Sequence, residues 1–540
     1  MQLSPLSWKL LSINYTFEPQ LQAVQFFDFQ PNAKQAIAQF AKSEFGSALV
    51  LKTELFPEFL AEIENEFSQH QCSVISKMEF TSNSLFGYQM YLSKEHKIQY
   101  VPGIIQQANH QILLLNLNNL LLDIHQWDKL KQALLFRHYT PNSANVLPSH
   151  IDEVVSVFKL VLVGNRDDVA TLSAYDDTLY QFCQYAEIDS YLALEEQNVV
   201  KWRNYIQSFA QEKIGKLFTD QGTNLLLNQF IRESESQKLI SISPTLLKKY
   251  ILGLAQFYPE QKELDHIQPY FDSLQQQAER LQQFALQDML TDQVYIETDD
   301  EVIGQINGLS VVEFDGVPYA FGEPLRISCN AQLGEGEIHD IERKVELGGN
   351  IHSKGILLAQ SCLANLLELP SQLPFSASLV FEQSYGEIDG DSSSLAIFCV
   401  LISSLAKVPL PQSFAVTGAI DQFGNVLSVG GVNQKIEGFF SLCNARGLTG
   451  KQGVIIPAVC MSHLSLNSEI IDAVKAEKFA IWAVSDVFEA IQILFARDFY
   501  TEDTGDFSDK SSIFTLINKQ LQSEETSGSF WQKLYNKLFH

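Results

Sequence analysis

Short apolar runs alternate with stretches of helical periodicity in the first third of the chain. The apolar runs lie at residues 47–52, 111–115 and 158–163. The stretches with apolar residues at helical spacing include residues 33–42, 58–67 and 126–135. Short strands that are apolar on both faces are typical of a parallel sheet covered by helices, and their alternation with helices is a βαβ rhythm. We therefore expect a parallel-sheet α/β domain over residues 1–171.

The pattern changes twice after this domain. Residues 172–294 are helical and rich in glutamine, which predicts a helical lid-like or linker subdomain. Within it, residues 272–289 place a leucine and phenylalanine stripe among long polar side chains, which is typical of a solvent-facing helix. From residue 295 glycine becomes frequent, and β-type segments alternate with helical ones. This change predicts a separate α/β domain over residues 295–497.

The expected strands of this second α/β domain lie at 302–312, 325–331, 376–381, 413–418 and 453–457. Its expected helices lie at 353–367, 392–407, 433–446 and 487–495. Residues 498–540 should form an acidic linker and an amphipathic tail helix, in which apolar residues fall at helical spacing: Phe530, Trp531, Leu534, Tyr535 and Leu538. Such a helix either packs on its own domain or docks on a partner or a membrane surface.

Composition narrows the class of protein. Of 540 residues, 46% are hydrophobic and 19% are charged, as in globular proteins that build apolar cores. The net charge of −27 repels phosphate backbones, so we expect no nucleic-acid partner. Residues 1–19 lack the pattern of a signal peptide, and the apolar runs are too short to span a bilayer. Seven scattered cysteines without a Cys-x-x-Cys pair indicate reduced thiols, so we expect a cytoplasmic protein with no metal and no cofactor.

Two short segments carry the most specific chemistry. Residues 389–394 read Asp-Gly-Asp-Ser-Ser-Ser and place hydroxyls where an apolar helix begins. Residues 430–435 read Gly-Gly-Val-Asn-Gln-Lys and place Lys435 in the first turn of another helix. A serine nucleophile needs a base, and lysine can serve only if burial or the positive end of a helix lowers its pKa. Ordinary helix caps and a surface lysine explain the same residues on local chemistry alone.

Several neighbours could support such a pair. Backbone N–H groups at the start of the 392–407 helix can stabilise an oxyanion, and Gly390 permits a tight backbone approach. Asp389 and Asp391 could orient the lysine or cap the helix. The competing nucleophiles are Ser393 and Ser394. The competing bases, for a histidine-based triad, are His339, His352 and His463, none of which lies in a recognisable triad motif.

These segments resemble a known protease family. Phe381-Glu-Gln-Ser-Tyr-Gly-Glu-Ile-Asp-Gly-Asp-Ser-Ser-Ser resembles the nucleophile motif of Lon-family proteases, in the archaeal-type variant with Gly-Asp-Ser. Residues 416–437 resemble the second block of that family, and residues 340–355 also resemble its archaeal-type domain. The resemblance, over about 300–495, implies that Ser392 is the nucleophile and that Lys435, 43 residues later, is the base. Thr417 matches a family position beside this dyad.

The first half of the chain resembles the AAA+ ATPase half of a bacterial Lon homologue but lacks its chemistry. The phosphate-binding pattern Gly-x-x-x-x-Gly-Lys-Ser/Thr is absent, and Lys52-Thr53 is at most a remnant. The strand at 112–115 runs into Asn116 and Leu117, where an ATPase carries Asp-Glu. Asn165 still matches the sensor position. The resemblance thus implies a degenerate AAA+-like domain without ATP hydrolysis.

Together these features predict a serine endopeptidase that hydrolyses peptide bonds in unfolded or damaged proteins through a Ser-Lys dyad. Family resemblance further implies a homo-oligomeric ring, a hexamer. Two alternatives stay open at this point. The first is a non-catalytic, AAA+-derived scaffold or chaperone-like binding protein. The second is an ATP-dependent protease with an unusual nucleotide site.

Overall fold

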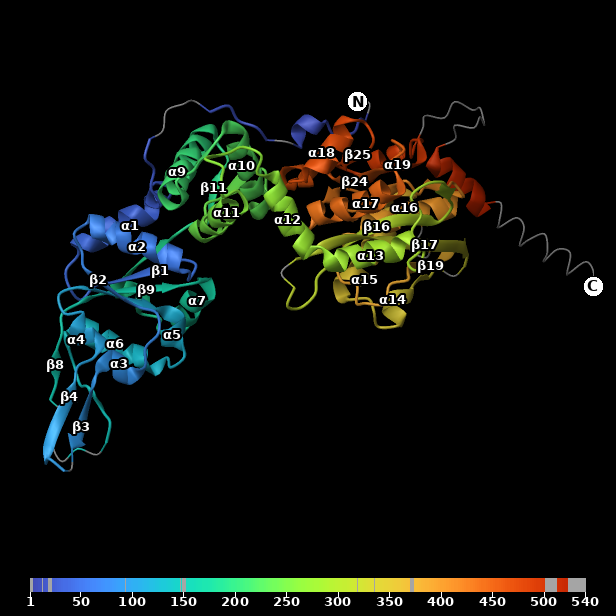
Figure 1. Cartoon of the computed structure of the whole chain (residues 1–540). Coiled ribbons are helices and arrows are strands. Elements are labelled where there is room, and N and C mark those ends of the chain that lie inside the picture. Colours follow the sequence, from blue (N-terminus) through green and yellow to red (C-terminus); the bar gives the residue numbers. More distant parts are fainter. Residues whose placement is uncertain are drawn as a thin grey trace, which may run out of the picture. The chain divides into compact units, whose positions relative to one another are not determined.

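The computed structural model describes residues 3–11, 13–17, 22–92, 94–145, 147, 152–317, 319–334, 336–369, 373–500 and 512–522 (Figure 1). The described residues form two compact units. One unit, the sheet-and-lid unit, comprises residues 16–223 and 239–267. The other, the protease-like unit, comprises residues 1–15, 224–238 and from 268 onward.

A five-stranded parallel sheet forms the centre of the sheet-and-lid unit, with the strand order β10-β1-β9-β5-β2. Its strands are β1 (Ala48–Lys52), β2 (Val74–Lys77), β5 (Ile112–Asn116), β9 (Lys159–Gly164) and β10 (Cys183–Glu187). The three central strands are almost entirely buried, as expected for a parallel sheet with helices on its faces. The three predicted strands and the parallel pairing are confirmed.

Helices and short strands surround this sheet. The helices are α1 (Pro31–Lys42), α2 (Pro57–Gln69), α3 (Ser82–Phe86), α4 (Ile104–Gln107), α5 (Leu117–Leu121), α6 (His125–Phe136), α7 (Arg166–Tyr175), α8 (Leu179–Phe182), α9 (Glu196–Ile214) and α11 (Pro244–Phe257), with the 3-10 turn η2 (Phe26–Phe29). The short strands are β3 (Tyr88–Leu92), β4 (Lys97–Val101), β6 (His138–Tyr139), β7 (Asn142–Ser143), β8 (Val154–Val155), β11 (Tyr191–Ala193), β12 (Leu217–Phe218), β13 (Leu239–Ser241) and β14 (Glu263–Leu264).

The protease-like unit is built on a seven-stranded mixed sheet with the order β18-β19-β17-β16-β21-β24-β25. Its strands are β16 (Gln305–Val312), β17 (Phe321–Leu333), β18 (Ile338–Asp340), β19 (Phe375–Glu382), β21 (Phe414–Val416), β24 (Gly453–Pro457) and β25 (Ala480–Val484). The neighbouring strands β16, β21, β24 and β25 run parallel to one another. Strand β17 runs antiparallel to both of its neighbours, β16 and β19. Each of the five predicted strands overlaps an observed one, but the segment 302–312 is divided into β15 (Glu301–Val302) and β16, and β18 and β25 were not predicted.

The remaining elements of this unit are η1 (Trp8–Leu10), α10 (Asp220–Ser234, from residue 224 onward), α12 (Gln268–Ala278), α13 (Arg280–Leu290), α14 (Ile341–Lys344), α15 (Asn350–Leu366), α16 (Ser394–Ala406), α17 (Val432–Arg446), η3 (Ala458–His463), α18 (Ser468–Lys475) and α19 (Val487–Phe495). Short strands are β15 (Glu301–Val302), β20 (Leu410–Pro411), β22 (Ala419–Ile420) and β23 (Val426–Leu427). Residues 513–522 are also helical.

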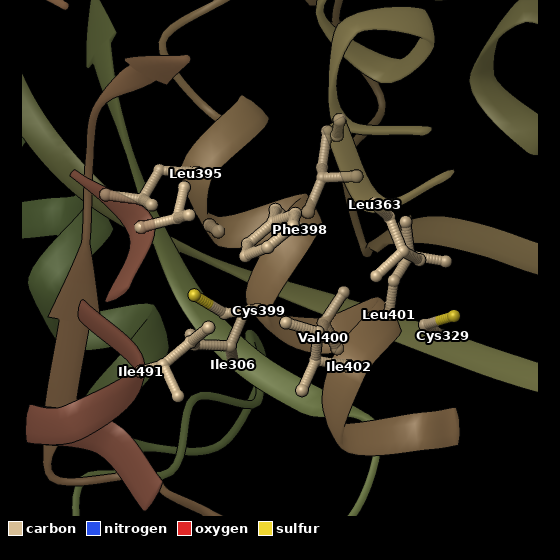
Figure 2. Packing of buried hydrophobic residues seen from close by; sticks show 14 of the residues in the cluster. Ile306, Cys329, Leu363, Leu395, Phe398, Cys399, Val400, Leu401, Ile402 and Ile491 are labelled. Atoms are coloured by element: carbon tan, nitrogen blue, oxygen red, sulfur yellow. The ribbon is translucent and has the colours of Figure 1, made fainter. Parts of the chain in front are cut away.

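Two apolar cores lie on opposite faces of the mixed sheet. Alternation along β24 separates them, because Ile455 packs in one core while Val454 and Ile456 pack in the other. The first core contains α15, α16 and α19, and every residue of α16 is buried in it. Figure 2 shows Phe398 and its neighbours on α16 packed beside Leu363 of α15. The second core contains α17 and α18. The sheet therefore holds the start of α16 and the start of α17 in fixed places.

The structure differs from the sequence prediction at several domain boundaries and in one helix. Residues 1–15, expected in the first domain, group with the protease-like unit. The parallel sheet continues beyond residue 171, because β10 pairs with β1 at its edge. The middle segment 172–294 is divided, since residues 224–238 and 268–294 group with the protease-like unit. The helix expected over 272–289 is two helices, α12 and α13, with Glu279 between them outside helical geometry. The predicted tail helix at residues 530–538 lies outside the described residues.

Candidate active site

Ser392 lies just before α16, at the end of a loop that is tied to another helix. The Asp389 carboxylate accepts hydrogen bonds from the N–H groups of Gly390, Ile351 and His352. It therefore caps the start of α15, and not the 392–407 helix or the lysine for which the sequence proposed it. Gly390 has a φ of 125°, which non-glycine residues rarely adopt, so glycine is required here for its backbone conformation.

Lys435 lies in the first turn of α17, which packs unusually close to β17. A side chain at Gly438 would lie 2.0 Å from the carbonyl oxygen of Gly322, so only glycine fits at this crossing. Gly431 precedes α17 in the left-handed region, with a φ of 62°. These glycines let the helix approach the sheet, and the Lys435 side chain is consequently buried, with 4% exposure.

The two predicted residues meet through their side chains. Lys435 Nζ lies 3.0 Å from Ser392 Oγ and 3.2 Å from Thr417 Oγ1, donating to both. The Thr417 hydroxyl in turn donates to the Ser392 carbonyl oxygen at 3.3 Å, and the Gly418 N–H donates to the same oxygen at 2.8 Å. Thr417 directly follows β21, so the three side chains converge at the carboxyl end of a parallel strand.

Burial changes the acidity of the lysine. Removal of the ammonium group from water lowers the pKa of Lys435 to about 8, against 10.5 for a free lysine. Cys460 and Asp391 act in the opposite direction, because negative charge near the amine favours its protonated form. The net effect leaves a substantial fraction of neutral amine near physiological pH, which is the form that can accept a proton.

The competing serines have other roles in the structure. The buried Ser394 hydroxyl donates to the Asp391 carbonyl oxygen and accepts from the Ile420 N–H, both at bonding distance. Ser393 occupies the N-cap position of α16, but its hydroxyl makes no capping hydrogen bond. Among the hydroxyls of this triplet, the hydrogen bond from Lys435 goes to Ser392.

The candidate histidines lie elsewhere. The His339 ring is hydrogen-bonded to the Lys344 amine. The His352 ring packs edge-on against Phe381. The His463 carbonyl accepts a hydrogen bond from the Asn433 side chain. Within the described residues, none of these rings is hydrogen-bonded to Ser392. The geometry therefore does not assemble a histidine-based triad.

In the sheet-and-lid unit, the residues that match ATPase positions lie at the carboxyl ends of β1, β5 and β9. Lys52 Nζ is paired with Glu187 at 2.9 Å instead of being free for a phosphate. The Asn116 side chain caps α5, and the Asn165 side chain caps α7 through the Asp168 N–H. Thus the side chains at the expected ATPase positions, Lys52, Asn116 and Asn165, all make contacts within the protein.

Comparisons with known proteins agree with this geometry. Residues 385–497 match the sequence profile of the Lon protease (S16) C-terminal proteolytic domain, and residues 70–188 match that of a LonB-like AAA domain. A Lon protease homologue of Haemophilus influenzae is 42% identical over 97% of this chain and 95% of its own length. The chain belongs to the Lon protease family. A homologue from Escherichia coli K12 is 40% identical over 76% of this chain and 71% of its own length.

The relationship to archaeal Lon proteases is confined to part of the chain. The archaeal Lon protease of Methanocaldococcus jannaschii is 32% identical over 38% of this chain and 29% of its own length. These matches confirm the family that the two sequence motifs predicted. They also confirm the predicted α/β fold class. The LonB-like AAA match reaches residue 188 and so includes β10, the strand that lies beyond the expected domain boundary.

One contact near the Lon-type site could not be predicted from the sequence. Arg232 of α10 binds the Glu437 carboxylate through both terminal nitrogens, at 2.6 and 2.7 Å, and also the Ser465 carbonyl oxygen. Glu437 lies two residues after Lys435 in the second motif, but its partner is more than 200 residues away. This bidentate pair holds α17 against α10, and no local pattern signals it.

None of the helices in the described part of the chain is long and apolar enough to cross a membrane.

Proposed function

We propose that this Lon-family protein is a serine endopeptidase that cleaves unfolded or damaged polypeptides through a Ser392–Lys435 dyad. The observation that carries this proposal is the contact between a buried, low-pKa lysine amine and the Ser392 hydroxyl. A lysine that served only as a surface charge would not be buried at a serine. Family membership supports the reaction class, peptide-bond hydrolysis.

The reaction follows from the arrangement of the three side chains. In the neutral form Lys435 accepts the Ser392 hydroxyl proton as Oγ attacks the scissile carbonyl carbon. The resulting ammonium ion then protonates the leaving amine, and an ester links the substrate acyl group to Ser392. Water, deprotonated by the same amine, attacks this ester; the bond between the acyl carbon and Ser392 Oγ breaks, Oγ takes the proton back from the ammonium group, and the carboxylic acid product leaves. Thr417 accepts a hydrogen bond from the amine and keeps Nζ directed at Ser392.

The developing oxyanion needs hydrogen-bond donors. The N–H groups of Asp391, Ser392 and Ser393 have no hydrogen-bond acceptor within the described part of the chain. They precede α16, whose N-terminal dipole favours negative charge. We assign the oxyanion site to this backbone, as the sequence predicted for the start of the helix. Asp391 is close enough to raise the pKa of Lys435, so its role is electrostatic.

We further propose that the first half of the chain does not hydrolyse ATP. Lys52 is engaged by Glu187, and Asn116 stands where a carboxylate would bind magnesium. Without a motor to unfold substrates, the substrates are chains that are already unfolded.

From the family resemblance we also propose a homo-oligomeric ring of six chains, which light scattering on the purified chain would test. A cytoplasmic location and the domain limits 295–497 for the protease and 498–540 for the tail also stay predictions.

The experiment that tests this function is degradation of casein by the purified full chain, with and without ATP and Mg²⁺. Equal rates in both conditions, lost in Ser392→Ala, would support a dyad protease with a vestigial motor. Cleavage that requires ATP would contradict the proposal for the first half of the chain. No cleavage under either condition would favour the alternative raised by the lost ATPase residues, a non-catalytic scaffold or chaperone-like binder.

The pH dependence of proteolysis should report the pKa of Lys435. Because the amine must be neutral to act as a base, kcat/KM should increase about tenfold per pH unit below pH 8 and level off above it. The measurement is the initial rate on a fluorogenic unfolded substrate at subsaturating concentration from pH 6 to 10. A flat profile through this range, or activity that falls as pH rises through 8, would contradict lysine as the base.

Replacement of Thr417 tests its role in positioning the amine. In Thr417→Val the hydroxyl that accepts from Lys435 is lost while the side-chain shape is kept, so kcat should fall roughly 10- to 100-fold. The acidic limb of the pH profile should also move to lower pH, because an acceptor that favours the ammonium ion is gone. Thr417→Ser should restore most of the rate. If Val lowers the rate without moving the pH profile, Thr417 has only a structural role.

A further inference from the structure

Three chemically reactive side chains outside the proposed dyad lie together in the protease-like unit. Asp340 ends β18, Glu342 lies in α14, and His352 lies in the first turn of α15. One ligand atom from each lies within 4.8 Å of the others. Glu342 is 4% exposed and the His352 side chain is fully buried, so this is an interior cluster and not an acidic surface patch.

Each carboxylate in the cluster has one oxygen held by the backbone and one oxygen without a hydrogen-bond partner. Asp340 Oδ1 accepts from the Arg343 N–H, and Glu342 Oε1 accepts from the Phe381 N–H at 2.8 Å. Asp340 Oδ2 and Glu342 Oε2 are buried and make no hydrogen bond. Carboxylates that ligate a metal are commonly oriented by such hydrogen bonds through the oxygen that does not face the ion.

The histidine completes the donor set. Both ring nitrogens of His352 are buried and without a hydrogen bond, and Nε2 lies 3.6 Å from Asp340 Oδ1. The ring is fixed edge-on against Phe381, with centroids 5.0 Å apart, and its Cδ2 would lie 3.0 Å from a side chain at Gly348. Unsatisfied buried polar atoms typically cost about 1–3 kcal/mol each. One bound ion could use one ring nitrogen and one oxygen of each carboxylate, so the cluster offers three ligand atoms.

We propose that Asp340, Glu342 and His352 bind one divalent transition-metal ion, of which Zn²⁺ is the representative. One imidazole nitrogen and two carboxylate oxygens form the ligand set of a three-residue zinc site, and nitrogen donors disfavour Mg²⁺ and Ca²⁺. A dication bound here would offset the charge of the two buried carboxylates. The site is separate from the Ser-Lys dyad, and the sequence did not predict it.

This metal site would stabilise the loop that presents Ser392. The N–H groups of Ile351 and His352 bind Asp389, three residues before Ser392. The Gly349 N–H donates to the Ile388 carbonyl, and the Ile388 N–H donates to the Leu347 carbonyl. An ion bound to His352 would therefore link β18 and α14 to the start of α15, and through it to residues 388–389. Its role is structural, since none of its ligands contacts the dyad.

The test is metal binding by the full chain carrying Ser392→Ala, which prevents self-cleavage. After removal of metal with a chelator, calorimetric titration with Zn²⁺ should show one site per chain. Co²⁺ should give visible absorption bands typical of a low-symmetry site with nitrogen and oxygen ligands. Added Zn²⁺ should also raise the melting temperature by several degrees, a readout independent of catalysis.

Matched variants make this proposal falsifiable. His352→Ala and the near-isosteric Glu342→Gln should each weaken Zn²⁺ affinity at least tenfold and abolish the thermal shift. Glu342→Gln is included because His352→Ala removes a buried ring and could impair folding. His339→Ala, which alters a half-buried histidine next to the cluster, should leave affinity unchanged. Absence of Zn²⁺ binding, or affinity that is the same in Glu342→Gln and the parent, would show that the cluster is only a buried ion pair.

Discussion

Ser392→Ala should abolish proteolysis by this protein while leaving its fold intact. The Ser392 hydroxyl receives a hydrogen bond from Lys435, but the backbone contacts of residue 392 do not depend on that hydroxyl. Loss of a serine nucleophile typically reduces kcat by roughly 10⁴-fold or more. The measurement is kcat/KM on casein or a fluorogenic peptide, with circular dichroism and the melting temperature as checks on folding.

The neighbouring serines provide controls for this prediction. Ser393→Ala should keep most of the activity, because Ser393 only occupies the N-cap position of α16. Ser394→Ala should lower the melting temperature, since the buried Ile420 N–H and Asp391 carbonyl would each lose their hydrogen bond to Ser394 Oγ. If Ser392→Ala retained activity and Ser393→Ala lost it, the assignment of the nucleophile would be wrong.

Local sequence patterns predicted the parts of the fold that depend on local chemistry. Strands β1, β5 and β9 were visible because each is a continuous apolar run, and β24 was predicted with its observed limits, residues 453–457. The helices α16 and α17 were visible from their apolar content and the glycines before α17. In contrast, β10 (Cys183–Glu187) lies at a sheet edge with only Cys183 and Ala186 buried, so no apolar run marks it.

Sequence patterns could not predict helix breaks without a local signal or contacts between distant residues. The break at Glu279 between α12 and α13 has no glycine or proline to signal it, so periodicity alone favoured one helix. Likewise, the grouping of residues 224–238 with the protease-like unit depends on contacts such as Arg232 with Glu437. For the candidate site, two motifs predicted which side chains matter, but only the fold shows that Thr417 joins Lys435 to the backbone of Ser392.

The same distinction applies to the proposed metal site. Asp340, Glu342 and His352 lie within a segment that resembles the family, yet their spacing matches no common metal-binding motif. Their donor atoms converge because β18 pairs with β19 while α15 begins beside the loop before Ser392. The sequence therefore supplies the ligands, and the packing of three separate elements supplies the site.

Lys435→Met is expected to separate catalysis from stability. Methionine is similar in length and carries no charge, so it fills the buried position without the cost of desolvating an ammonium group. The melting temperature should therefore be equal to or higher than that of the parent. Proteolysis should fall roughly 10²- to 10⁴-fold or more, because no base remains within reach of Ser392.

Lys435→Arg distinguishes a base from a simple positive charge. The guanidinium group stays protonated at every pH at which the protein is folded, so it can donate hydrogen bonds to Ser392 and Thr417 but cannot accept a proton. If Lys435 acts only by electrostatic attraction, Lys435→Arg should keep appreciable activity between pH 7 and 9. If it acts as the base, Lys435→Arg should be as inactive as Lys435→Met across this range. Equal loss in both variants, with folding retained in Lys435→Met, therefore requires that proton transfer at Nζ, and not its charge, drives peptide hydrolysis.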